Sequence, residues 1–134
     1  MLKKIDHIGI AVCSLEKSIP VFQELGLEFL GTEEVPSQKV MVAFFGAGSV
    51  HIELLEPTSN ESPIAKFLEK RGEGLHHVAY ETSDIEEEMR RLQASGFEFI
   101  DKEPRAGAHK SKVSFLHPRS TNSVLMEICE HLQA

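Results

Sequence analysis

The sequence contains an internal duplication, and this feature most narrows the folds open to its 134 residues. The segment DHIGIAVCSLEKSI, which begins at Asp6, matches HHVAYETSDIEEEM, which begins at His76. Later, VHIELLE from Val50 matches VLMEICE from Val124, and the offset between the two copies is slightly larger there than at their start. Repeats of this kind fold as similar supersecondary units that bury their apolar faces together. We therefore predict two modules of one fold, with a slightly longer loop in the second.

One helix is predicted near the start of each module. Ser14 and Ser83 are suitable N-caps, and Ser83 with Glu86 fits a capping box. Pro20 lies inside the first helix, which it is expected to kink or shorten because it removes a backbone hydrogen bond. Apolar residues with the i, i+4, i+7 spacing of one helix face recur in both modules: Leu15, Ile19 and Phe22 in the first, and Ile85, Met89 and Leu92 in the second.

Strands are predicted on both sides of each helix, which gives each module the order β-α-β-β-β. Gly26 and Gly96 occupy the position of a glycine at a helix C-terminus. The segments that follow them, LEFLG and FEFID, are expected to be strands. Next come KVMVAFFG and KVSFLH, and then the two strands that carry Glu53 and Glu127.

A linker joins the two modules. Its segment SPIAKFLEKRG predicts a short helix with Pro63 at the first position and Gly72 at the end. A chain of this length, 41% hydrophobic, is expected to form one domain with a core. The predicted domain spans residues 1–134, with module 1 at about 1–57, the linker at about 58–74 and module 2 at about 75–134.

Two adjacent histidines begin the second module, and strand geometry separates their roles. Neighbouring side chains of a strand point to opposite faces, so His76 and His77 lie on different sides. His77 matches His7 of the first module, and each has a small residue two positions later, Ala79 and Gly9. Small neighbours leave room for a ligand beside these two histidines. His76 is expected to be hydrogen-bonded on the far face.

Each module also carries one strand glutamate that lies between two apolar residues. This is Glu53 in the first module and Glu127 in the second. A single strand histidine or glutamate usually faces solvent, but four at matching positions of two repeats indicate a shared site. Two imidazoles and two carboxylates suit a divalent ion such as Co²⁺, Ni²⁺, Mn²⁺ or Zn²⁺. We predict one such ion per chain, bound by His7, Glu53, His77 and Glu127, with two positions open for a chelating substrate.

The remaining histidines carry less functional signal. His51 and His131 are expected to be exposed neighbours of the glutamate strands. His109 lies in the glycine-containing loop RAGAHKSK, where substrate contact and simple surface exposure are both open. His117 precedes a proline and is expected to be structural.

Charge and composition exclude several classes of protein. The net charge of −7 argues against a general nucleic-acid-binding surface, which needs positive charge. No apolar run approaches the roughly 20 residues of a membrane span, and the N-terminus lacks the features of a signal peptide. Cys13 and Cys129 form no CxxC pair, so a reduced cytoplasmic location is predicted.

Three segments carry a resemblance to a known family: DHIGIAV, ELLEPTSNESPIAKFLEKRGEGLHHVAYE and FLHPRSTNSVLMEI. They resemble the vicinal oxygen chelate superfamily and, within it, the methylmalonyl-CoA epimerases. The resemblance implies an α+β fold in which two tandem β-α-β-β-β modules form a curved mixed sheet around a metal site. It also implies that His7, His77 and Glu127 are metal ligands and that Glu53 takes a fourth position held by glutamine or glutamate. An acyl-CoA is the implied substrate. We expect a homodimer, with each site completed within one chain or by exchange between chains.

The sequence departs from that family at two places. Some bacterial epimerases carry a glutamate, proposed as one of two bases, on the strand that here contains Val42 and Ala43. Asn122 and Ser123 replace glycines before the last strand. The first departure leaves the identity of one base open, and both leave the exact substrate open.

The predicted chemistry is epimerisation of methylmalonyl-CoA from the 2R to the 2S form. The reaction removes a proton beside a thioester and returns it on the opposite face, which requires a base on each face. Glu53 and Glu127 come from opposite modules and are the predicted bases. Basic residues near the C-terminus either meet the phosphates of coenzyme A or remain solvated: Lys102, Arg105, Lys110, Lys112 and Arg119.

Two alternatives stay open. A glyoxalase I-type lactoylglutathione lyase uses a similar His/Glu/His/Glu set, and a substrate assay separates it from the epimerase. A metal-free binding protein of the same fold needs no ligand set, and metal analysis separates it from both enzymes.

Overall fold

The computed structural model describes residues 1–132 and divides the chain into two compact units. The N-terminal unit is His7–His76. The C-terminal unit combines Met1–Asp6 with the chain from His77 onward. Each unit contains one module of the duplication, except that the first residues of the chain belong with the second module. None of the described helices is long and apolar enough to span a membrane.

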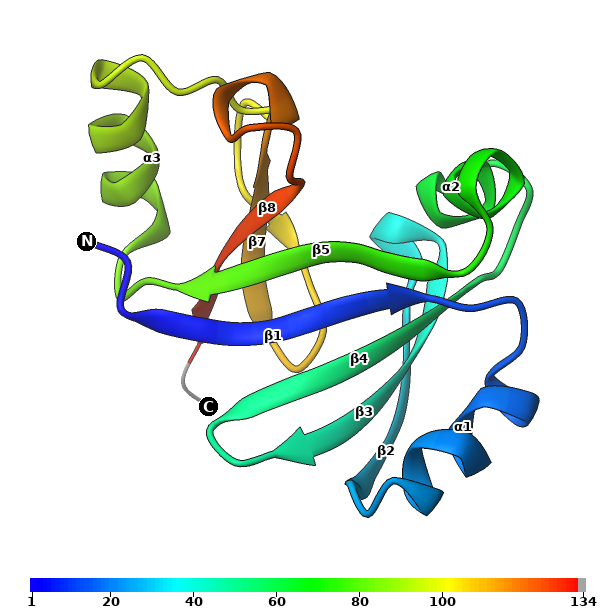
Figure 1. Ribbon diagram of the computed structural model, residues 1–134. Coiled ribbons are helices and arrows are strands. Elements are labelled where there is room, and N and C mark those ends of the chain that lie inside the picture. Colours follow the sequence, from blue (N-terminus) through cyan, green and yellow to red (C-terminus); the bar gives the residue numbers. More distant parts are fainter. Residues whose placement is uncertain (133–134) are drawn as a thin grey trace. The chain divides into compact units, whose positions relative to one another are not determined.

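The N-terminal unit has a mixed sheet in the order β2-β3-β4-β1. Strand β3 is antiparallel to β2 and to β4, and β1 is parallel to β4. Helix α1 lies beside the strands of this unit (Figure 1). The elements are β1 (Lys4–Ala11), α1 (Leu15–Glu24), β2 (Glu28–Val35), the 3-10 helix η1 (Pro36–Gln38), β3 (Val40–Ala47), β4 (Val50–Pro57) and α2 (Pro63–Arg71).

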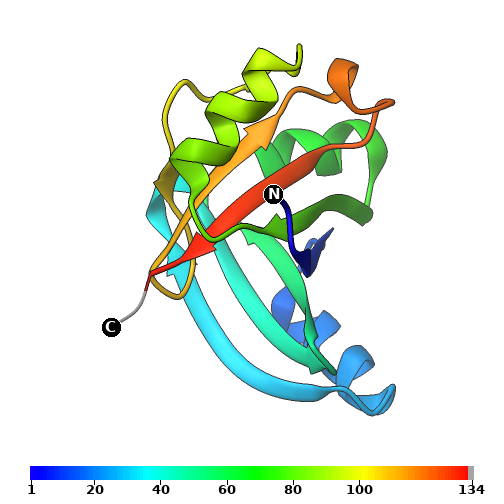
Figure 2. The same cartoon turned by 90° about the vertical axis from the view of Figure 1, so that its left-hand side faces the viewer.

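The C-terminal unit repeats this pattern in the order β5-β8-β7-β6. Strand β8 is parallel to β5 and antiparallel to β7, and β6 is antiparallel to β7. Helix α3 packs on β7 and β8 through an apolar cluster and runs alongside them in Figure 2. The elements are β5 (Gly74–Glu81), α3 (Ile85–Ala94), β6 (Arg105–Ala106), β7 (Ser111–Leu116), the 3-10 helix η2 (Pro118–Ser120) and β8 (Met126–His131).

The apolar helix residues with i, i+4, i+7 spacing pack between helix and sheet in both units, as predicted. Leu15 in the first unit and Ile85 in the second are buried against strand residues that also match, Leu54 and Ile128. Gly26 and Gly96 have φ values of 94° and 97°, which confirms their positions just after the helices. The two modules therefore share one β-α-β-β-β fold of the α+β class.

A second glutamate on each glutamate-bearing strand caps the helix of its unit. An oxygen of Glu56 accepts the N–H of Leu15 at 2.7 Å, and an oxygen of Glu130 accepts the N–H of Ile85 at 2.9 Å. Each donor is the first residue of a helix, where backbone N–H groups have no partner within the helix. The carboxylate satisfies that donor and favours the positive end of the helix dipole.

The helix starts confirm one predicted cap and correct the other. Ser14 accepts the N–H of Lys17, as expected. In the second module, however, Asp84 is the N-cap and accepts the N–H of Glu87 at 3.1 Å. The prediction of Ser83 with Glu86 was wrong by one residue, because the helix begins where Ile85 enters the core.

Pro20 does not shorten the first helix, so that part of the prediction was wrong. Helices α1 and α3 both have 10 residues, although Pro20 lies inside α1. Pro20 is exposed, and the contacts of Ile19 and Phe22 with the core hold the helix across it.

The segment FEFID was also predicted wrongly as a regular strand. Only an isolated bridge joins Phe99 to Leu116, and the short strand β6 follows at Arg105–Ala106. Two backbone hydrogen bonds, from Ile100 and from His117, still tie the segment to the chain around β7. Pro104, which follows shortly after, has no backbone N–H and cannot donate to a ladder.

Two further predictions are confirmed. The connection from β7 to β8 contains η2 and is longer than the tight turn between β3 and β4. The linker helix α2 begins with Pro63 after the N-cap Ser62 and ends at Arg71, with Gly72 as its C-cap. His76 packs edge-on against Phe67 of this helix, with ring centroids 5.0 Å apart. Burial lowers the pKa of His76 to about 4.

Replacing Glu56 by Ala should destabilise the protein by about 1–2 kcal/mol, because it removes both a cap and a favourable helix-dipole charge. Glu56→Gln should cost less, since its amide oxygen still accepts the Leu15 N–H. Urea unfolding measures both. Glu24→Ala, at the other end of the same helix, is the matched control and should change little. Equal stability of Glu56→Ala and the wild type would contradict the capping role.

The lowered pKa of His76 predicts acid sensitivity. The folded protein keeps this imidazole neutral down to about pH 4, whereas the unfolded chain protonates it near pH 6.5. The stability that His76 contributes is therefore present above pH 6.5 and is lost as the pH falls toward 4. Between pH 7.5 and 5, the free energy of unfolding of wild type should fall by up to about 2 kcal/mol more than that of His76→Phe. The phenylalanine keeps an aromatic ring but cannot titrate. Urea unfolding in the presence of a chelator tests this, and parallel losses in the two proteins would refute it.

Candidate functional site

The N-terminal unit brings together its predicted histidine and glutamate. His7 lies on β1 and Glu53 on the parallel strand β4, where Glu53 pairs with Gly9. Nδ1 of His7 is 3.3 Å from Oε2 of Glu53, and their side chains are only 7% and 12% exposed. Gly9 has no side chain, so nothing from that position stands between the two.

The C-terminal unit forms the equivalent pair. His77 lies on β5 and Glu127 on the parallel strand β8, where Glu127 pairs with Ala79. Nε2 of His77 is 3.7 Å from Oε2 of Glu127, and both side chains are 4% exposed. In each unit the glutamate pairs with the residue two positions after the histidine. The duplication therefore reproduces one histidine–glutamate arrangement twice.

An aromatic ring borders each pair. Phe115 of β7 pairs with Glu127 across the sheet, and its ring meets His77 edge-on at a centroid distance of 5.4 Å. Phe44 of β3 holds the matching position opposite Glu53 and is buried. The Phe115 ring covers one side of the His77–Glu127 pair, where a less polar environment strengthens electrostatic interactions.

The two adjacent histidines have the different roles that strand alternation predicts. His77 lies with Glu127, whereas His76 packs on the helix α2. The predicted register of β5 is therefore correct, since a slip by one residue would exchange the two.

The imidazole and carboxylate groups of the two pairs fit a divalent metal ion of borderline hardness. Imidazole nitrogens and carboxylate oxygens are ligands for cobalt, nickel, manganese and zinc. A buried carboxylate is unfavourable unless a cation or hydrogen bonds compensate it, and Glu127 is among the most buried charged residues of the described chain. The residues present thus suit an ion better than they suit an apolar cavity.

The departures noted in the sequence have structural counterparts. On β3 the face that carries Phe44 also carries Val42, and both residues are buried and apolar. Glu53 therefore has no carboxylate opposite it on β3. Asn122 and Ser123 have φ values of 58° and 68°, the left-handed region that favours glycine.

Most of the basic residues proposed to meet phosphate have acidic partners. Arg105 lies 3.4 Å from Asp101, Lys112 lies 3.1 Å from Glu86, and Arg119 lies 3.1 Å from Glu98. The hydrogen bond from Lys112 to Glu86 also raises the pKa of that lysine. Two exposed lysines of this set remain, Lys102 and Lys110.

The other histidines differ in how well they were predicted. His117 caps η2 by accepting the N–H of Arg119, which confirms a structural role. His109 is exposed, with a φ of 53°. His131 was expected to be a simple exposed neighbour, but its Nε2 lies 2.7 Å from Oδ1 of the buried Asp6. Sequence reasoning missed this contact, and no local pattern in the sequence points to it.

Comparison with known proteins assigns the family. The model of the glyoxalase/bleomycin resistance protein/dioxygenase superfamily matches residues 6–115. An uncharacterised protein of Bacillus subtilis is 47% identical, over 96% of this chain and 93% of that protein. The ethylmalonyl-CoA/methylmalonyl-CoA epimerase of Cereibacter sphaeroides is 38% identical, over 96% of this chain and 98% of that protein.

Solved structures agree. A variant of the Streptomyces coelicolor methylmalonyl-CoA epimerase, in complex with 2-nitronate-propionyl-CoA, has a TM-score of 0.95 and 34% identity. The match covers 99% of this chain and 100% of that chain. The chain therefore belongs to the glyoxalase/bleomycin resistance protein/dioxygenase superfamily and has the vicinal oxygen chelate fold of the methylmalonyl-CoA epimerases within it.

Proposed function

We propose that the protein is a metal-dependent epimerase that interconverts the 2R and 2S forms of methylmalonyl-CoA. The observation that carries this proposal is the repeated pairing of a buried histidine with a glutamate, one pair in each unit. Relatives named methylmalonyl-CoA epimerase align with nearly the whole chain, which supports the choice of substrate.

The metal ligands are proposed to be His7, Glu53, His77 and Glu127, which together would hold one divalent ion per chain. Cobalt, nickel, manganese and zinc all suit this donor set. When bound, the ion would supply Lewis-acid stabilisation of negative charge beside the thioester, worth several kcal/mol of the barrier.

Proton transfer is proposed to rest on the two glutamates. An ionised carboxylate accepts a proton and returns it, and epimerisation needs one such group on each face of the substrate. Since Val42 and Phe44 offer no base on β3, Glu53 takes the second role beside Glu127. Phe44 and Phe115 would keep water from the reacting carbon.

Further parts of the proposal concern the substrate tail and the assembly. The exposed Lys102 and Lys110 are the candidates for contact with the phosphates of an acyl-CoA. We propose a cytoplasmic homodimer as the working form. The glyoxalase I-type lyase is kept as the second candidate, because β3 lacks the additional carboxylate of some epimerases.

The decisive experiment follows α-proton exchange. Metal-loaded protein is incubated with methylmalonyl-CoA in deuterated water, and deuterium at the α-carbon and interconversion of the epimers are measured together. Exchange with interconversion supports the epimerase. Turnover of a glutathione hemithioacetal without exchange on methylmalonyl-CoA would instead support the lyase.

Metal content should depend on His7 and His77 but not on His76. Purified wild type should contain about one divalent ion per chain, since one ligand set exists per duplicated domain. His7→Ala and His77→Ala should each abolish binding and activity. His76→Ala, the matched control, should keep the ion. Elemental analysis gives the answer, and loss of the ion from His76→Ala but not from His77→Ala would refute the ligand assignment.

Replacing each of the two glutamates by glutamine should separate its role in proton transfer from its role in metal binding. Glutamine keeps an oxygen donor but cannot accept the substrate proton, so Glu127→Gln should retain much of the metal and lose about a hundredfold or more in turnover. If Glu53 is the second base, Glu53→Gln should fail comparably, and each variant should still exchange the α-proton of one epimer. Full activity of Glu53→Gln would leave that residue as a ligand only. Full activity of both variants, with metal bound, would overturn the mechanism.

A further inference from the structure

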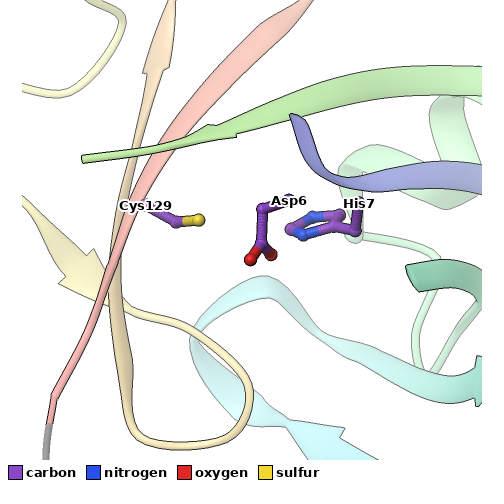
Figure 3. Close-up of side chains that lie close together, drawn as sticks. All are labelled: Asp6, His7 and Cys129. Carbon is purple, nitrogen blue, oxygen red and sulfur yellow. The ribbon is translucent and has the colours of Figure 1, made fainter. Parts of the chain in front are cut away.

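A partly buried acid–base contact in the C-terminal unit has no part in the proposed proton transfer. Asp6 is 7% exposed, and its Oδ1 lies 2.7 Å from Nε2 of His131. Its carboxylate also lies within 4.8 Å of the thiol of the buried Cys129, which points toward it (Figure 3). Two residues of β8, Cys129 and His131, thus lie beside the Asp6 carboxylate.

The contact joins two segments that matter for the proposed ligands. Asp6 directly precedes His7, whose side chain Figure 3 also shows. His131 ends β8, the strand that carries Glu127. The hydrogen bond spans 125 residues of sequence, so it fixes the backbone just before one proposed ligand to the strand of another.

The duplication provides an internal comparison for this contact. In the alignment of the two modules, His76 stands at the position of Asp6, and Pro57 stands at the position of His131. His76 packs against Phe67, and Pro57 has no polar side chain. The N-terminal unit therefore forms the same sheet and the same histidine–glutamate pair without an equivalent contact. The fold of a module does not require it.

We propose that Asp6 is a positioning residue for His7, held by His131. The hydrogen bond fixes the backbone that presents the His7 imidazole, and it thereby raises the affinity for the divalent ion. This inference rests on the proposed function only in that His7 binds the ion. His131 needs its Nε2 proton for this role, because an ionised carboxylate accepts but does not donate.

The test measures Co²⁺ affinity by calorimetry and the visible absorption spectrum of the Co²⁺ form. Asp6→Ala and His131→Ala should each weaken Co²⁺ binding by about tenfold or more, as loss of groups that orient a ligand does in other metal sites. The absorption bands should also shift or change in intensity, because the ligand field of the ion changes. His131→Gln can still donate to Asp6 and should restore most of the affinity.

Arg90→Ala is the matched control. It breaks an exposed ion pair with Glu87 in the same unit and should leave affinity and spectrum unchanged. If Asp6→Ala does not fold, His131→Ala gives the answer alone, because that side chain is 43% exposed at the end of its strand. Wild-type affinity and spectrum in a folded His131→Ala would overturn the positioning role. A wild-type protein that binds no divalent ion would instead overturn the proposed function, and this inference with it.

Discussion

Burial of a carboxylate beside an imidazole is the constraint on which the rest of the structure depends. Glu127 lies in an interior where an uncompensated charge is strongly disfavoured. Its neighbours on the same face are His77 and the ring of Phe115, and the small Ala79 keeps the space between them open. The matching residues of the N-terminal unit repeat this environment. A sequence selected only for a stable core would place aliphatic residues at these positions, so the pairs indicate a function that requires them.

The glutamate strands also connect the pairs to the helices. In each unit a second glutamate follows the first by three positions, which directs the two carboxylates to opposite faces of the strand. Glu53 faces His7, whereas Glu56 caps α1 on the other side. In the C-terminal unit Glu127 likewise faces His77, and Glu130 caps α3. The strand that holds a proposed ligand therefore also anchors the helix that buries the core, and a shift of one would disturb the other.

Regular repetition explains how much of this was predictable. His7, Glu53, His77 and Glu127 stand at matching positions of two modules, so one strand pattern read twice was sufficient to find both pairs. The cap at Asp84 was missed because Ser83 with Glu86 imitates a capping box, although comparison with Ser14 indicates the correct residue. The contact between Asp6 and His131 was missed for another reason. It joins the two ends of the chain and has no counterpart in the other module, so neither local pattern nor duplication reveals it.

The proposed epimerisation would explain why a duplicated module is a useful scaffold and why its two halves need not remain identical. Epimerisation removes a proton from one face of a carbon and returns it on the other, so it needs a base on each face, and a repeat can offer two carboxylates from one strand pattern. A bound ion would require fixed ligands, whereas a base must be able to move with its proton. Glu127 is the more buried of the two carboxylates, and its unit contains the additional contact of Asp6 with His131. Glu53 is more exposed, and its unit lacks that contact. In the proposed mechanism, the more exposed Glu53 is therefore the carboxylate better suited to carry a proton.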